Sequence, residues 1–211
     1  PETGVLTIFI EFSGRITDNM TGIYPSYYTY NGEKKEIIST QFESHFAREA
    51  FPCVDEPEAK ATFDLSLKFD AEEGDTALSN MPEINSHLRE ETGVWTFETT
   101  PRMSTYLLAF GFGALHGKTA KTKNGTEVGV FATVAQAENS FDFALDIAVR
   151  VIEFYEDYFQ VKYPIPLSYH LALPDFSAGA MENWGLVTYR EVYLLVDENS
   201  SAASRQQVAL V

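Results

Sequence analysis

The chain of 211 residues is long enough for one large domain or two small ones, and its content of 45% hydrophobic and 22% charged residues is that of a globular protein. Its formal net charge of −16 argues against nucleic acid and anionic membrane surfaces as partners, because both are bound through cationic side chains. No apolar run reaches the roughly 18–20 residues of a membrane span.

The first half of the chain has the two-residue period of β-strands with one buried face. Residues 5–12 and 63–69 alternate in this way, and 94–98 and 106–112 are further strand candidates. Turn signals such as Asn31-Gly32 separate them. Several short strands with this punctuation predict an antiparallel β-sandwich or saddle domain, which we assign to residues 1–116.

A long helix is expected after the next strand candidate, at residues 128–133. Residues 140–159 are apolar on most faces, and either Asn139 or Ser140 can cap the start of the helix. One polar stripe interrupts the apolar faces, at Asp142, Asp146, Arg150, Glu153 and Asp157. The sequence thus predicts an amphipathic helix with a wide buried face.

The remainder of the chain predicts further strands and a last helix. Residues 167–173 alternate as a strand, and another strand pair is expected around 185–196. Asn199-Ser200-Ser201 is typical of a helix start. The fold class is therefore mainly β with some α, and the pattern changes after about Gly117.

Both ends of the sequence suggest a piece of a longer protein. The first residue is Pro1 rather than Met. The last helix stops at Val211 on apolar residues, with no glycine, basic turn or proline to end it. We therefore expect that the natural chain continues beyond the sequence in hand.

Several familiar kinds of catalytic site do not occur in the sequence. No two histidines have the three-residue separation of a zinc pair, and the sequence contains neither a nucleophile elbow nor a phosphate-binding loop. The single cysteine, Cys53, excludes an internal disulfide and indicates a reducing compartment. Three glycosylation sequons leave a secreted location open, at Asn19, Asn124 and Asn199.

Two short segments stand out for their chemistry. Residues 40–57 contain Gln41 and Glu43 and then a proline-containing turn, and residues 179–185 read Gly-Ala-Met-Glu-Asn-Trp-Gly. From composition alone, the second segment is an ordinary loop whose polar residues face water. However, residues 179–183 match the exopeptidase motif of the aminopeptidase N family of zinc metallopeptidases, and the whole chain resembles that family, especially its members from lactic-type bacteria.

The resemblance implies a protein that removes N-terminal amino acids from peptides in the cytoplasm. The fold it implies is an N-terminal β-sandwich or saddle that lacks its first strands here, followed at residues 117–211 by the β-rich opening part of a thermolysin-like α+β catalytic domain. The zinc signature and the tyrosine that stabilises the tetrahedral intermediate lie beyond Val211 in the family. We therefore expect neither catalytic residues nor bound zinc in this chain, although zinc is the cofactor of the whole enzyme.

The substrate-binding residues that the resemblance implies form an amine clamp. A peptide's α-amino group is mostly a cation at neutral pH, so it needs anionic partners when it leaves water. Glu182 is then the main clamp, and Glu43 and Gln41, two positions apart as on one strand face, complete it.

The other motif residues have lesser roles in this interpretation. Gly179 and Ala180 let the substrate backbone approach the chain. Met181 packs or lines the pocket, and Asn183 orients Glu182 or the substrate carbonyl. The expected partner is a peptide with a free N-terminus.

Two other functions remain open from the residues. A non-catalytic β-sandwich could bind carbohydrate or peptide through some of its eleven tyrosines. A glycoside hydrolase could use Glu43 and Glu182 as its carboxylate pair, which would require a separation of ~5–9.5 Å and one raised pKa. The second alternative leaves Gln41 and the neighbouring Gly-Ala-Met unexplained.

Overall fold

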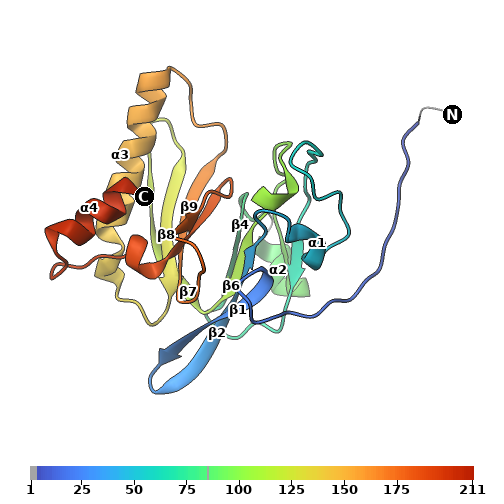
Figure 1. Cartoon of the computed structure of the whole chain (residues 1–211), viewed down its shortest axis with the longest axis horizontal. Helices are drawn as coiled ribbons and strands as arrows, with labels where there is room; N and C mark the ends of the chain where they lie inside the picture. The colour runs from blue at the N-terminus through green and yellow to red at the C-terminus, as the bar shows by residue number, and fades with distance from the viewer. Residues whose placement is uncertain (1–3, 85) are drawn as a thin grey trace.

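The structure, a computed structural model that describes residues 4–84 and 86–211, contains two larger β-sheets and a two-stranded sheet of β3 and β5 (Figure 1). The first sheet has the strand order β1-β2-β6-β4 with antiparallel neighbours throughout. The second has the order β10-β11-β9-β8-β7, in which β9 is parallel to both of its neighbours. The strands are β1 (Gly22–Tyr30), β2 (Glu33–Gln41), β3 (Ser66–Lys68), β4 (Thr76–Ser79), β5 (Val94–Thr96), β6 (Phe110–Gly113), β7 (Leu115–Lys121), β8 (Glu127–Thr133), β9 (Leu167–Leu173), β10 (Ala180–Met181) and β11 (Leu186–Arg190).

The second sheet lies between the first sheet and two helices. Figure 1 shows α3 and α4 on the face of this sheet that is turned away from the first sheet. Alternate residues of β9 reach opposite faces, since Ala172 packs in the core under the helices and Leu171 and Leu173 pack in the core shared with the first sheet. The helices are α1 (Ala47–Ala50), α2 (Ser86–Thr92), α3 (Asp142–Phe159) and α4 (Ala202–Leu210), with 3₁₀ turns η1 (Thr105–Leu107), η2 (Glu138–Ser140) and η3 (Glu191–Tyr193).

The hairpin of β1 and β2 has the turn that the sequence predicted. Asn31 and Gly32 both have positive φ, at 52° and 82°, as a tight hairpin turn requires. The hairpin pairs along its full length, from Tyr30 opposite Glu33 to Gly22 opposite Gln41. This pairing places Gln41 at the end of a strand and sets the direction of the segment that follows.

The predicted strand at residues 63–69 is confirmed in its side-chain pattern. Phe63, Leu65, Leu67 and Phe69 are half-buried, while the residues between them are exposed. Regular pairing is limited to β3, which lies antiparallel to β5. The carbonyls of Phe63 and Leu65 also accept backbone hydrogen bonds from Thr100 and Phe97.

Two strand predictions in the first half were wrong in whole or part. Residues 5–12 are extended and exposed but belong to no strand of the described chain; Val5 is 101% exposed and Phe9 89%. An apolar period of two predicts the side-chain pattern of a strand, but a strand also needs a neighbour for its backbone groups. In residues 106–112 only the second half is β6, because Thr105–Leu107 forms a 3₁₀ turn.

The long helix is confirmed, with two corrections. Its N-cap is Phe141, which gives no side-chain cap, because Asn139 and Ser140 lie in the preceding turn η2 and the hydroxyl of Ser140 donates to the carbonyl of Ala137. The wide buried face is also wrong in part, because only Ala144 and Glu156 of the helix are buried and the other inward-facing residues are half-buried. Its last turns expose four aromatic residues, Phe154, Tyr155, Tyr158 and Phe159.

The strand at residues 167–173 and the last helix are confirmed. The strand pair expected around residues 185–196 is confirmed only in part, because residues 186–190 form β11 but Glu191–Tyr193 form the turn η3. β8 and β9 lie where alternation placed them, and α4 begins after Ser201, whose hydroxyl accepts the backbone N–H of Ser204. The fold class, mainly β with some α, is therefore confirmed, while the boundary at residues 116 and 117 stays a prediction. No helix in residues 4–84 and 86–211 is long and apolar enough to cross a membrane.

Candidate functional site

Gln41 and Glu43 lie at the end of β2, in contrasting surroundings. Gln41 is the last residue of the strand and is 6% exposed, whereas Glu43 is exposed in the turn that follows. Between them, Phe42 is fully buried, and its carbonyl accepts the N–H of Phe46 as the chain turns toward α1. The strand therefore ends before Glu43, and the common direction of the two side chains stays a prediction.

The side-chain oxygen Oε1 of Gln41 is a buried acceptor without a donor. No described residue donates a hydrogen bond to this atom. A buried acceptor that stays unpaired costs free energy comparable to a lost hydrogen bond. Gln41 therefore holds an acceptor that a donor from outside the described residues would satisfy.

The Gly-Ala-Met-Glu-Asn segment lies at the edge of the second sheet. Ala180 and Met181 form β10, which pairs antiparallel with β11, and the carbonyl of Gly179 accepts the N–H of Arg190 at 3.0 Å. Met181 is fully buried and Asn183 is 2% exposed, while Glu182 between them is exposed. Two buried neighbours thus fix the backbone on either side of an exposed carboxylate.

Asn183 is turned into its own loop. Its Nδ2 donates to the carbonyl of Leu186 at 3.2 Å and lies 3.4 Å from the hydroxyl of Thr188 and 3.5 Å from the carbonyl of Met181. The backbone N–H of Leu186 also donates to the carbonyl of Asn183. These contacts hold the turn that carries Glu182, while both roles expected of Asn183, to orient Glu182 or the substrate carbonyl, stay predictions.

The fold does not require a glycine at position 179. A Cβ built on Gly179 would lie 3.4 Å from the ring of Tyr193, an ordinary contact distance, and its φ is not positive. Ala180 beside it is half-buried. A Cβ at position 179 would therefore fit beside Tyr193 without a clash.

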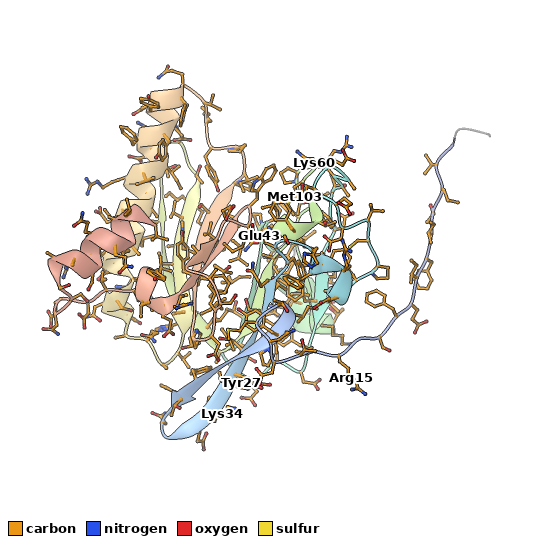
Figure 2. The ribbon with its side chains drawn as sticks, in the orientation of Figure 1. Arg15, Tyr27, Lys34, Glu43, Lys60 and Met103 are labelled. Carbon is orange, nitrogen blue, oxygen red and sulfur yellow. The ribbon has the colours of Figure 1, made fainter. Side chains whose placement is uncertain are left out.

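The two segments share one hydrophobic core. Phe42 and Met181, far apart in sequence, both belong to the cluster that also contains Met103 and Leu186. Figure 2 draws Glu43 between the first sheet and the second sheet. Residues adjacent to the two candidate clamp carboxylates are therefore held by the same core, while the meeting of the carboxylates themselves at one ligand stays a prediction.

Neither candidate carboxylate is neutralised within the structure. Among residues 4–84 and 86–211, no ion pair involves Glu43 or Glu182. Residues 4–84 and 86–211 also contain no group of three or more His, Cys, Asp or Glu side chains that could hold a metal ion. The two carboxylates are therefore available to a cationic group.

The sequence analysis did not single out two residues whose hydrogen bonds join distant segments of the chain. Asp175 and Asn80 each form a hydrogen bond between the first part of the chain, which contains the first sheet and ends at Gly113, and the second part, which contains the second sheet and begins at Leu115. Asp175 accepts the N–H of Tyr27, and Asn80 donates to the carbonyl of Trp184. Each is a single polar residue with no periodic or motif signal, so only the three-dimensional structure identifies it.

Comparison with known proteins gives consistent matches over the chain. Residues 1–107 match the Peptidase M1 N-terminal domain, and residues 143–211 match the Peptidase family M1 domain. The chain is 64% identical over 211 residues to an aminopeptidase N of Lactococcus lactis subsp. cremoris (strain MG1363), covering 100% of this chain and 24% of that protein.

More distant relatives have similar names. An aminopeptidase N of Lactobacillus helveticus is 60% identical over 210 residues, covering 99% of this chain and 24% of its own length. A puromycin-sensitive aminopeptidase of Caenorhabditis elegans is 47% identical over 205 residues, covering 95% of this chain and 21% of its own length. The chain thus spans about a quarter of the length of the curated relatives it matches.

Proposed function

The chain belongs to peptidase family M1, and we propose that it is the part of a zinc-dependent aminopeptidase that receives the free N-terminus of a peptide. The matches are to peptidase domains and aminopeptidases, which favours this function over a carbohydrate-binding module or a glycoside hydrolase.

The proposed clamp binds the α-ammonium group of the substrate through Glu182. The observation that carries the proposal is the arrangement at residues 181–183, in which buried Met181 and Asn183 flank the exposed carboxylate. Such a fixed backbone presents a charge at a defined place, and a charge-assisted hydrogen bond to an ammonium group is about twice as strong as a neutral one. Glu43 supplies a second charge, and Gln41 supplies the acceptor that lacks a donor.

Gly179 and Ala180 are proposed to hold the substrate backbone. The fold leaves space beside Gly179 that a Cβ could enter, so the small side chains serve the approach of another chain rather than internal packing. A peptide lying there would add a short strand beside β10. Met181, being fully buried, serves packing rather than contact with the peptide.

Zinc, partners and location complete the proposal. The zinc ligands would come from residues outside this chain, since residues 4–84 and 86–211 contain no ligand group for it. The expected substrates are peptides with a free N-terminus, and the single cysteine favours a cytoplasmic location.

Substitution of Glu182 in the full-length protein tests the proposal. Glu182→Ala is expected to lower kcat/KM for an unblocked aminoacyl anilide by ~10²-fold or more. Glu198→Ala, which removes another exposed carboxylate from the same part of the chain, is the matched control and should leave kcat/KM unchanged. Wild-type kinetics for Glu182→Ala would refute the clamp.

A further inference from the structure

Asn80 is a buried amide that connects the two parts of the chain. It follows β4 directly and is 1% exposed. Its Nδ2 donates to the carbonyl of Leu107 at 2.8 Å and to the carbonyl of Trp184 at 2.6 Å, and its Oδ1 accepts the N–H of Ala109 at 2.9 Å. Two of these bonds stay within the first part of the chain, and the third reaches the turn that follows Glu182.

The backbones of the two segments also meet closely at this point. Gly185 has a φ of +76°, and a Cβ built on it would lie 1.9 Å from the carbonyl oxygen of Asn80. The carbonyl of Gly185 in turn accepts the N–H of Tyr169 at 2.8 Å, from β9. Only glycine permits this close approach to Asn80. The turn therefore contacts Asn80, beside the first sheet, and Tyr169, in the second sheet.

We propose that Asn80 is a positioning residue for Glu182, and that it acts through the carbonyl of Trp184. This inference rests on the proposed function of Glu182 as the amine clamp. Glu182 has no ion pair in residues 4–84 and 86–211, so its place depends on the backbone that carries it. A displacement of about 1 Å in a residue that positions substrate can cost ~10²-fold in rate.

A double-mutant cycle in the full-length protein tests the inference. The variants are Asn80→Ala, Glu182→Gln and the pair, compared by kcat/KM on an unblocked aminoacyl anilide. If Asn80 acts through Glu182, Asn80→Ala alone is expected to lower kcat/KM about tenfold, and in the Glu182→Gln background less than about twofold. A merely structural role would give the same loss in both backgrounds.

Ser79→Ala is the matched control. Ser79 is 2% exposed at the same strand end, and its hydroxyl donates to the carbonyl of Ala109 at 2.9 Å, but it does not reach the turn after Glu182. It should keep kcat/KM within about twofold of the wild type. If Asn80→Ala does not yield folded protein, Asn80→Ser, which keeps a polar group at the site, takes its place in the cycle.

The outcomes separate the two proposals. A loss with Glu182→Gln together with equal losses from Asn80→Ala in both backgrounds would overturn the role of Asn80 and leave the clamp standing. An equal loss with Ser79→Ala would do the same. Unchanged kinetics for Glu182→Gln would remove the proposed function, and the inference with it.

Discussion

The carboxylate of Asp175 accepts the backbone N–H of Tyr27 at 2.7 Å. Tyr27 lies on β1, at the edge of the first sheet, and Asp175 lies between β9 and β10. The hydroxyl of Ser26 accepts the N–H of Asp175, and the hydroxyl of Tyr24 donates to its carbonyl. Asp175 thus accepts a hydrogen bond from a backbone N–H of an edge strand and connects the two sheets.

Replacing Asp175 with alanine should destabilise the chain. Asp175→Ala leaves the N–H of Tyr27 without its partner, so the free energy of unfolding is expected to fall by about 1–3 kcal/mol. Urea unfolding of the 211-residue chain measures this change. Asp146→Ala, which removes only the exposed pair with Arg150, is the control and should cost at most about 0.5 kcal/mol. Equal losses in the two variants would contradict the prediction.

The elements that the sequence predicted well have local signals. The alternation in β8 and β9 and the apolar faces of α3 are properties of neighbouring residues, and α4 has its cap at Ser201. The predictions that were wrong depend on contacts with segments that are distant in the sequence. Residues 5–12 have a strand pattern without a strand neighbour among the described residues.

The motif identified the candidate site, but no sequence signal identified the residues that contact the motif and hold it in place. The motif identified residues 179–183, but only the structure shows that Met181 and Asn183 are buried while Glu182 is exposed. The contact of Asn80 with Trp184 joins residues 104 positions apart, and such contacts leave no pattern in a single sequence. The motif therefore identifies a candidate segment, whereas the contacts that hold this segment are found only in the structure.

Glu43 should contribute to substrate binding less than Glu182. Glu43→Gln in the full-length protein keeps the shape of the side chain and removes its charge, so kcat/KM for an unblocked aminoacyl anilide is expected to fall about tenfold. Steady-state kinetics measure the effect. Glu58→Gln, another exposed glutamate of the first part, should leave the kinetics unchanged. A loss no larger than that of Glu58→Gln would exclude Glu43 from the clamp.

The 211-residue chain by itself should neither retain zinc nor hydrolyse peptides. Protein zinc sites use three or four side-chain ligands, and residues 4–84 and 86–211 contain no such group. Metal analysis after dialysis should give far less than one zinc per chain, whereas the full-length protein should retain about one. Stoichiometric zinc in the short chain, or turnover that a chelator blocks, would contradict this.

The stability of the chain should depend on pH through His170. This residue lies on β9, and its Nδ1 is 3.0 Å from the hydroxyl of Tyr189. Burial lowers the pKa of His170 to about 4, below the ordinary value of about 6.5. Between these values the unfolded chain binds a proton that the folded chain does not, so the free energy of unfolding should fall as the pH falls from about 6.5 to about 4.

A non-titrating variant isolates this contribution. His170→Gln keeps a hydrogen-bonding side chain but cannot take up the proton, so the stability difference between wild type and variant should shrink by up to about 3 kcal/mol between pH 7 and pH 4. Urea unfolding at a series of pH values measures it. His87, whose side chain is 91% exposed, is the control, and His87→Gln should follow the wild-type curve. If His170→Gln follows that curve as well, His170 is not kept neutral by burial in the folded chain.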